Sequence, residues 1–76
     1  MQSIQVLHDE LRGLVAEERE ALVLFLHKLD AFDRDDGYLA FAKGSLWAYL
    51  VEDLGLRESS AGRRIAAMKL LRGAAS

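Results

Sequence analysis

The sequence contains no cysteine and no proline. Without Cys, the chain cannot form a disulfide framework or a zinc site built on thiolates, and it fits the reducing cytoplasm. Long apolar runs are also missing, since the longest, Ala21 to Leu26, is too short to span a bilayer. The N-terminus lacks the basic region and apolar core of a secretory signal. We therefore expect a cytoplasmic protein with no membrane association.

The composition is that of a folded domain, with 51% hydrophobic and 29% charged residues in a chain of 76. This length allows one domain at most. Apolar residues recur at spacings of three and four nearly throughout, which is typical of helices. The sequence predicts an all-α fold: a single small four-helix domain over residues 1–76, with a helix-turn-helix-like pair at about 45–72 and a frayed tail at 73–76.

The first half of the chain is expected to contain two helices. Ser3 is a plausible N-cap of the first, and Gly13 weakens its end. The second is expected to begin near Glu17 and Glu18 and to bury one face, formed by Leu22, Phe25, Leu26, Leu29 and Phe32. Whether residues 13–17 separate two helices or only bend one is left open.

Residues that typically end or begin helices divide the middle of the chain. Gly37 is predicted to end the second helix in a left-handed cap, and residues 38–43 to form a connection or a single turn. Ser45 is the expected N-cap of a third helix. Trp47, in the densest apolar segment, is the predicted anchor of the core.

Positive charge is concentrated at the C-terminal end. Residues 57–76 hold five of the ten Lys and Arg residues but only one acid, Glu58, in a chain of net charge −2. Gly55 would supply the turn of a helix-turn-helix, with Leu54 and Leu56 packing the two helices together. The following helix is expected to be capped by Ser59 or Ser60.

The periodicity of this last helix separates two faces. Ala61, Ile65, Met68 and the stem of Arg72 share the predicted inner face, whereas the outer face combines Arg63, Ala66, Ala67 and Leu70. Arg63 and Ser59 or Ser60 are the candidate base readers, and the other basic residues are candidate phosphate contacts. The complete candidate set is Arg57, Ser59, Ser60, Arg63, Arg64, Lys69 and Arg72.

The stretch GSLWAYLVEDLGLRESSAGRRIAAMKLLR, residues 44–72, resembles the helical region that precedes the nuclease domain in bacterial HNH endonuclease-like proteins. The resemblance rests on Ser45-Leu46, Tyr49, Leu54-Gly55-Leu56 and Arg63-Arg64-Ile65. Gly62 and Asp35-Asp36-Gly37 depart from the family's pattern. The His-Asn-His chemistry of the nuclease has no counterpart in this chain. The resemblance therefore implies an accessory DNA-associated module without catalysis.

The sequence contains no set of residues whose types and spacing indicate a catalytic or metal-binding site. His8 and His27 lack partners at metal-ligand spacing, and we expect both at the surface, with no metal and no cofactor. We interpret the chain as a non-enzyme that binds duplex DNA, mainly through phosphates. The alternative is a protein-interaction domain, a small inhibitor or adaptor of a nucleic-acid-handling protein. Under either interpretation, a homodimer or a protein partner would use Val23, Leu24 and Leu70.

Overall fold

The structure, a computed structural model, describes residues 3–74 and contains only helices in that range. The elements are α1 (Ile4–Arg34), α2 (Gly37–Ala40), α3 (Leu46–Ala48), the π-helix η1 (Tyr49–Asp53) and α4 (Glu58–Ala74). The predicted all-α fold class is confirmed. Of the predicted frayed tail, residues 73 and 74 form the end of α4, and residues 75 and 76 lie outside the described range.

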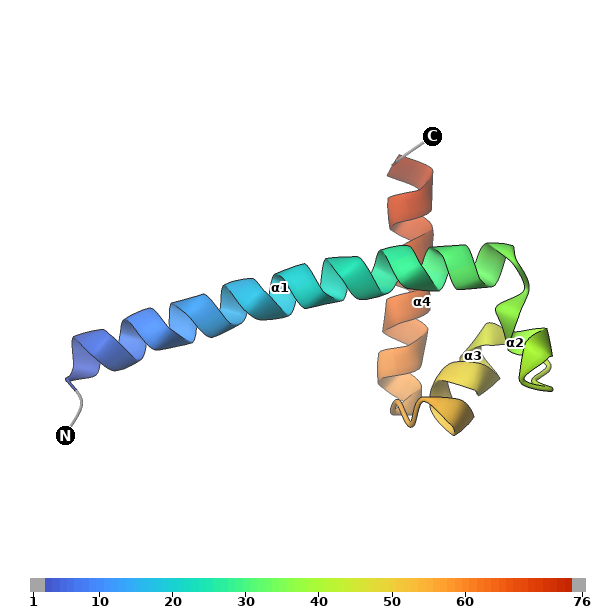
Figure 1. The fold of residues 1–76 in the computed structure, drawn as a ribbon, viewed down its shortest axis with the longest axis horizontal. Helices are drawn as coiled ribbons and strands as arrows, with labels where there is room; N and C mark the ends of the chain where they lie inside the picture. The colour runs from blue at the N-terminus through green and yellow to red at the C-terminus, as the bar shows by residue number, and fades with distance from the viewer. Residues whose placement is uncertain (1–2, 75–76) are drawn as a thin grey trace.

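α1 is one continuous helix of 31 residues (Figure 1). Its start is capped as predicted, because the Ser3 hydroxyl accepts a hydrogen bond of 3.1 Å from the backbone N–H of Val6. The expected second start near Glu17 is wrong. A glycine inside a helix costs only about 1 kcal/mol relative to alanine, and Gly13 is followed by good helix formers such as Leu, Ala, Glu and Arg.

The turn after α1 uses an aspartate where a glycine was expected. Asp36 adopts the left-handed conformation, with φ of 51°, so the prediction that Gly37 supplies this cap is wrong. Gly37 is instead constrained by packing, because a Cβ there would lie 2.6 Å from the ring of Phe32. The single turn expected after it is present as α2.

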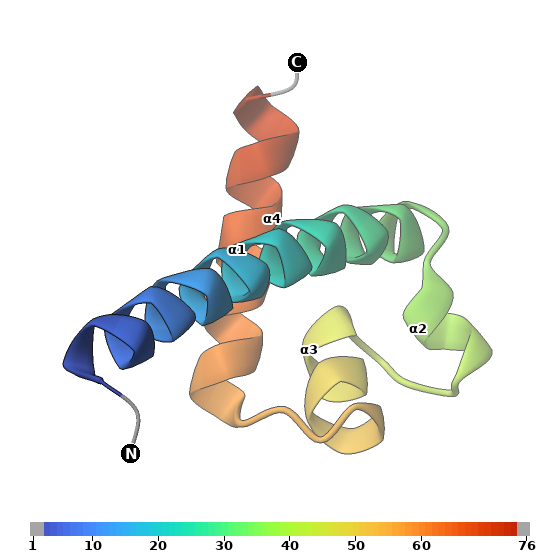
Figure 2. The same cartoon turned by 60° about the vertical axis from the view of Figure 1, so that its left-hand side comes forward.

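The core lies where α4 crosses the C-terminal half of α1, with α3 and η1 packed beside both (Figure 2). Six side chains are buried there: Leu26, Leu29, Leu46, Leu50, Ala61 and Met68. Phe25 and Phe32 pack against them, whereas Leu22, expected on the same buried face, is exposed. Phe32 also stacks on Tyr49 with ring centroids 4.4 Å apart. α1 is thus joined to α3 and η1 by aliphatic and aromatic contacts.

Trp47 is not the core anchor that the sequence predicts, since 41% of its surface is exposed. The Ser45 hydroxyl accepts from the Ala48 N–H at 3.0 Å and so sets where the helical turn begins. Leu46 and Leu50, four positions apart, share the face that points into the core. Trp47 is one position away from that face and therefore points outward.

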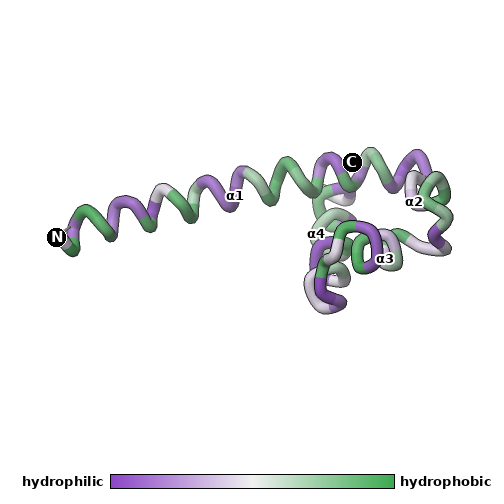
Figure 3. The backbone as a smooth tube through the Cα atoms, turned by 60° about the horizontal axis from the view of Figure 1, so that its bottom comes forward, coloured by the Kyte–Doolittle hydropathy of each residue, from purple (hydrophilic) through white to green (hydrophobic). Residues whose placement is uncertain are grey.

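The N-terminal half of α1 projects away from the rest of the molecule (Figures 1 and 3). The molecule measures 51 × 30 × 18 Å as a result. Every residue from Ile4 to Leu24 is exposed, and this includes the aliphatic side chains of the segment. Within residues 3–74, no helix combines the length and apolar character needed to cross a membrane.

Candidate nucleic-acid interface

The turn before α4 has the geometry that the sequence predicts. Gly55 has a φ of 74°, in the left-handed region that favours glycine. The backbone N–H of Leu56 donates to the carbonyl of Leu50 at 3.0 Å, and its side chain packs against the core. Leu54 is about half exposed, so the prediction that both leucines pin the helices together is wrong for Leu54.

α4 begins at Glu58, two to three residues earlier than a cap at Ser59 or Ser60 predicts. The N–H of Ala61 donates to the carbonyl of Arg57 at 2.9 Å, so helical hydrogen bonding starts at Arg57. Ser59 and Ser60 consequently lie inside the first turn and do not cap it, which makes the capping prediction wrong. Ser59 is exposed and Ser60 is half-buried.

The two predicted faces of α4 are largely confirmed. Ala61 and Met68 are fully buried and Ile65 packs against the core. On the opposite side Arg63, Ala66 and Leu70 are exposed. Ala67 is the exception, because it is half-buried and contacts the core rather than the outside.

The basic residues of the candidate set fall into two groups. Arg57, Arg63 and Lys69 are exposed to solvent, whereas Arg64 and Arg72 are half-buried. Arg64 lies over the ring of Phe25, with its guanidinium carbon 4.6 Å from the ring centroid. This is a cation–π contact between α4 and α1. The structure therefore gives Arg64 a structural partner that the sequence did not suggest.

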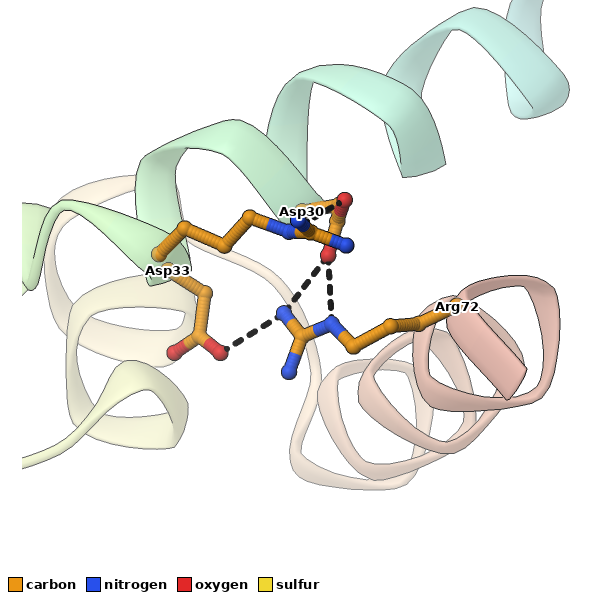
Figure 4. Close-up of polar contacts among 4 residues, drawn as sticks. Asp30, Asp33 and Arg72 are labelled. Atoms are coloured by element: carbon orange, nitrogen blue, oxygen red, sulfur yellow. Dashed lines mark hydrogen bonds and ion pairs between the residues drawn. The ribbon is translucent and has the colours of Figure 1, made fainter. Parts of the chain in front are cut away.

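Arg72 connects the end of α4 to the end of α1 (Figure 4). Its guanidinium donates to Asp30 at 2.6 Å and to Asp33 at 3.0 Å. Asp30 also accepts from Arg34 at 3.0 Å, so this carboxylate is shared between two arginines. The predicted inward stem of Arg72 is consistent with this position, and its charge is compensated by two acids of α1.

These contacts shift the ionisation of both partners. The hydrogen bond from Arg72 lowers the pKa of Asp30, and Arg34 acts in the same direction, while partial burial opposes them. The hydrogen bonds to Asp30 and then Asp33 raise the pKa of Arg72. The pair is therefore charged at neutral pH and holds α4 against α1.

The sequence reasoning missed Asp30 and Asp33, although it located the basic residue that they bind. Their spacing of three places both carboxylates on one side of α1, and this spacing is visible in the sequence. That they face Arg72 depends on the crossing of two helices, which the sequence does not specify. His8 and His27 are exposed, as predicted.

The described residues bring no three His, Asp or Glu side chains into an arrangement that could hold a metal ion. The exposed basic residues of the candidate set are Arg63, in the middle of a mostly small, apolar face of α4, Lys69 on the same helix and Arg57 just before it. Such a surface can contact phosphates and base edges. Comparison of the chain with protein-family models, curated proteins and solved structures found no significant match.

Proposed function

We propose that this domain binds duplex DNA without catalysis, through the outward face of α4. The observation that carries the proposal is the placement of α4 after the left-handed Gly55 turn. Its buried side is formed by Ala61 and Met68, and its opposite side is open and centred on Arg63. A helix held in this way by a preceding helix and a short turn can enter a major groove. An accessory role beside an HNH-type nuclease, suggested by the resemblance of residues 44–72, is part of the same proposal.

The exposed residues would make different kinds of contact with DNA. Arg57 and Lys69 are exposed and would contact phosphates, and Arg63 is the side chain that would reach a base edge. Ser59 is exposed on the same outward side as Arg63 and would add a hydrogen bond. Leu70 and Ala66 offer apolar contact to thymine methyl groups.

The internal contacts of Arg64 and Arg72 reduce the charge available to DNA. Arg72 is neutralised by two aspartates, and Arg64 is engaged with Phe25. Few phosphate contacts then remain, and since each releases condensed counterions, affinity is weak and falls as salt rises. A monomer should therefore show non-specific affinity in the range of about 10⁻⁴ to 10⁻⁶ M at physiological salt.

Fluorescence anisotropy with a labelled duplex, at salt concentrations from about 50 to 200 mM, tests the proposal. Lys69→Ala should weaken binding to all sequences alike and lower the salt slope by about one, and Arg63→Ala should additionally reduce any sequence preference. Arg12→Ala, an exposed arginine on the far half of α1, is the matched control and should change little. Salt-independent binding, or no binding at about 50 mM salt, would contradict the proposal.

The second candidate function is a protein-interaction domain, a small inhibitor or adaptor of a nucleic-acid-handling protein. It is favoured by the exposure of the three apolar residues named for it, Val23 and Leu24 on α1 and Leu70 on α4. Leu70 also belongs to the proposed DNA-binding face. Replacing Val23 and Leu24 by serine separates the two candidates, since DNA binding should be unchanged and only a protein partner would be lost.

A further inference from the structure

The N-terminal half of α1 carries an apolar stripe that nothing in residues 3–74 covers. Its members share one side of the helix and are between 39 and 83% exposed: Ile4, Leu7, Leu11, Leu14, Val15 and Leu22. The stripe continues at spacings of three and four into Phe25 and Leu29, which pack in the core. One continuous apolar face of α1 is therefore covered by α4 at its C-terminal end and left uncovered at its N-terminal end.

The spacing of this N-terminal stripe is that of a helix-pairing surface. Ile4, Leu7, Leu11 and Leu14 alternate steps of three and four, which places them at the a and d positions of a heptad repeat. Residues 4–22 extend over about 27 Å of helix. Burying the stripe in two copies removes on the order of 1,000 Å² of surface from water, which is the area that a specific interface requires.

We propose that a second copy of this chain covers the stripe, with the two α1 helices antiparallel. The occupant is a second copy because the stripe is complementary to itself in this orientation. When Leu11 of one copy meets Leu14 of the other, a and d positions face each other along the whole stripe and Ile4 reaches Ala21. Two matching layers of leucine then lie on either side of the symmetry axis.

Two further observations select the antiparallel orientation. Glu18 follows Leu14 at the next heptad position, so parallel helices would bring two Glu18 carboxylates together in the interface. In the antiparallel register Glu18 lies opposite Leu7 of the other copy, so the two Glu18 carboxylates are kept apart along the helices. α4 also crosses α1 on the side of Leu26 and Leu29, and parallel copies would bring two α4 helices against each other. In an antiparallel pair, the two α4 helices lie at opposite ends of the dimer.

Sedimentation equilibrium in high salt without DNA measures the oligomeric state directly. We expect a dimer for the natural chain and a monomer for Leu14→Glu, which places a charge in the centre of the pair. Leu24→Glu is the matched control, because Leu24 lies on the same helix and is exposed to a similar degree, 58% against 55% for Leu14, but lies outside the stripe. A monomeric natural chain, or a dimer that only Leu24→Glu dissociates, overturns the proposal.

Disulfide formation tests the orientation, since the natural chain has no Cys. A mixture of Ile4→Cys and Ala21→Cys should oxidise to the mixed dimer, because the two positions face each other in the antiparallel register. Ile4→Cys alone should not, since its two copies would lie about 26 Å apart along the helices, beyond the reach of a disulfide. Efficient self-oxidation of Ile4→Cys would establish parallel helices and overturn this arrangement.

The dimer does not depend on the proposed DNA binding. Its interface is apolar, so association should persist at salt concentrations that abolish phosphate contacts. Failure of the dimer at high salt therefore leaves the DNA titration at low salt untouched. Failure of DNA binding likewise leaves the sedimentation result unchanged.

Discussion

The two halves of α1 have similar apolar spacing but very different surroundings. From Ile4 to Leu24 every residue is exposed, whereas Leu26 and Leu29 are buried by α3, η1 and α4. An isolated helix in water is marginal, because its stability comes mostly from packing of its apolar face. The N-terminal half is a continuation of a helix that is anchored at the other end and capped at Ser3. Amphipathic spacing thus predicts that a face needs cover, but not what covers it.

The largest contrast is expected between a leucine of the buried core and a leucine of the exposed half of α1. Leu50→Ala removes a completely buried side chain and should lower the free energy of unfolding by about 2–5 kcal/mol. Leu24→Ala, on the exposed half of α1, should change it by at most about 0.5 kcal/mol. Chemical denaturation followed by circular dichroism measures both. Equal effects would mean that the core and the exposed half of α1 do not differ in packing as described.

A smaller effect is expected at the turn that orients α4. Gly55→Val forces a β-branched residue into a left-handed conformation, which should cost about 1–3 kcal/mol. Gly13→Ala is the counterpart in the exposed half and should stabilise α1 by about 0.5–1 kcal/mol, since no neighbouring atom lies within 4 Å of the added Cβ. Thermal melts of both variants compare them. A neutral Gly55→Val would contradict a fixed turn at this position.

The smallest effect is expected at the ion pairs between α1 and α4. Because the folded-state pKa of Asp30 is lowered, its pairing stabilises the fold at neutral pH, and this contribution is lost as pH falls through that pKa. Asp30→Asn should therefore be less stable than the natural chain at pH 7, and the two should converge in acid. Urea titrations at several pH values test this. Asp35→Asn, an exposed aspartate beyond the end of α1, is the matched control and should change the free energy of unfolding at pH 7 by at most about 0.5 kcal/mol.

Local signals in the sequence predicted local structure well. The caps at Ser3 and Ser45, the single turn after Asp36 and the left-handed Gly55 follow from side-chain hydrogen bonding and backbone freedom within a few residues. The inner face of α4 was also predictable, because its period of 3.6 residues is explicit in the spacing of Ala61, Ile65 and Met68. The question left open at residues 13–17, a break or a bend, is answered by one continuous helix, because a single glycine is too weak a signal to end it.

Signals that depend on distant contacts were misread or missed. Trp47 was expected inside because it lies in the densest apolar segment, but the register set by Ser45 gave the core positions to Leu46 and Leu50. In the candidate interface, Arg57, Arg63 and Lys69 are exposed as a DNA contact requires. The stem of Arg72 was expected on the inner face, but its two aspartate partners were not predicted. The contact of Arg64 with Phe25 was not predicted either.

The sequence by itself determined the helical class, the caps at Ser3 and Ser45, the turn at Gly55 and the concentration of basic residues near α4, because each depends on neighbours along the chain. Only the tertiary structure decided which of these features are available to a partner. The crossing of α4 over α1 places Asp30 and Asp33 against Arg72 and Phe25 against Arg64, and it buries only the far end of the apolar stripe. Charge compensation and burial depend on which segments meet in space, and that information lies in the packing of the helices.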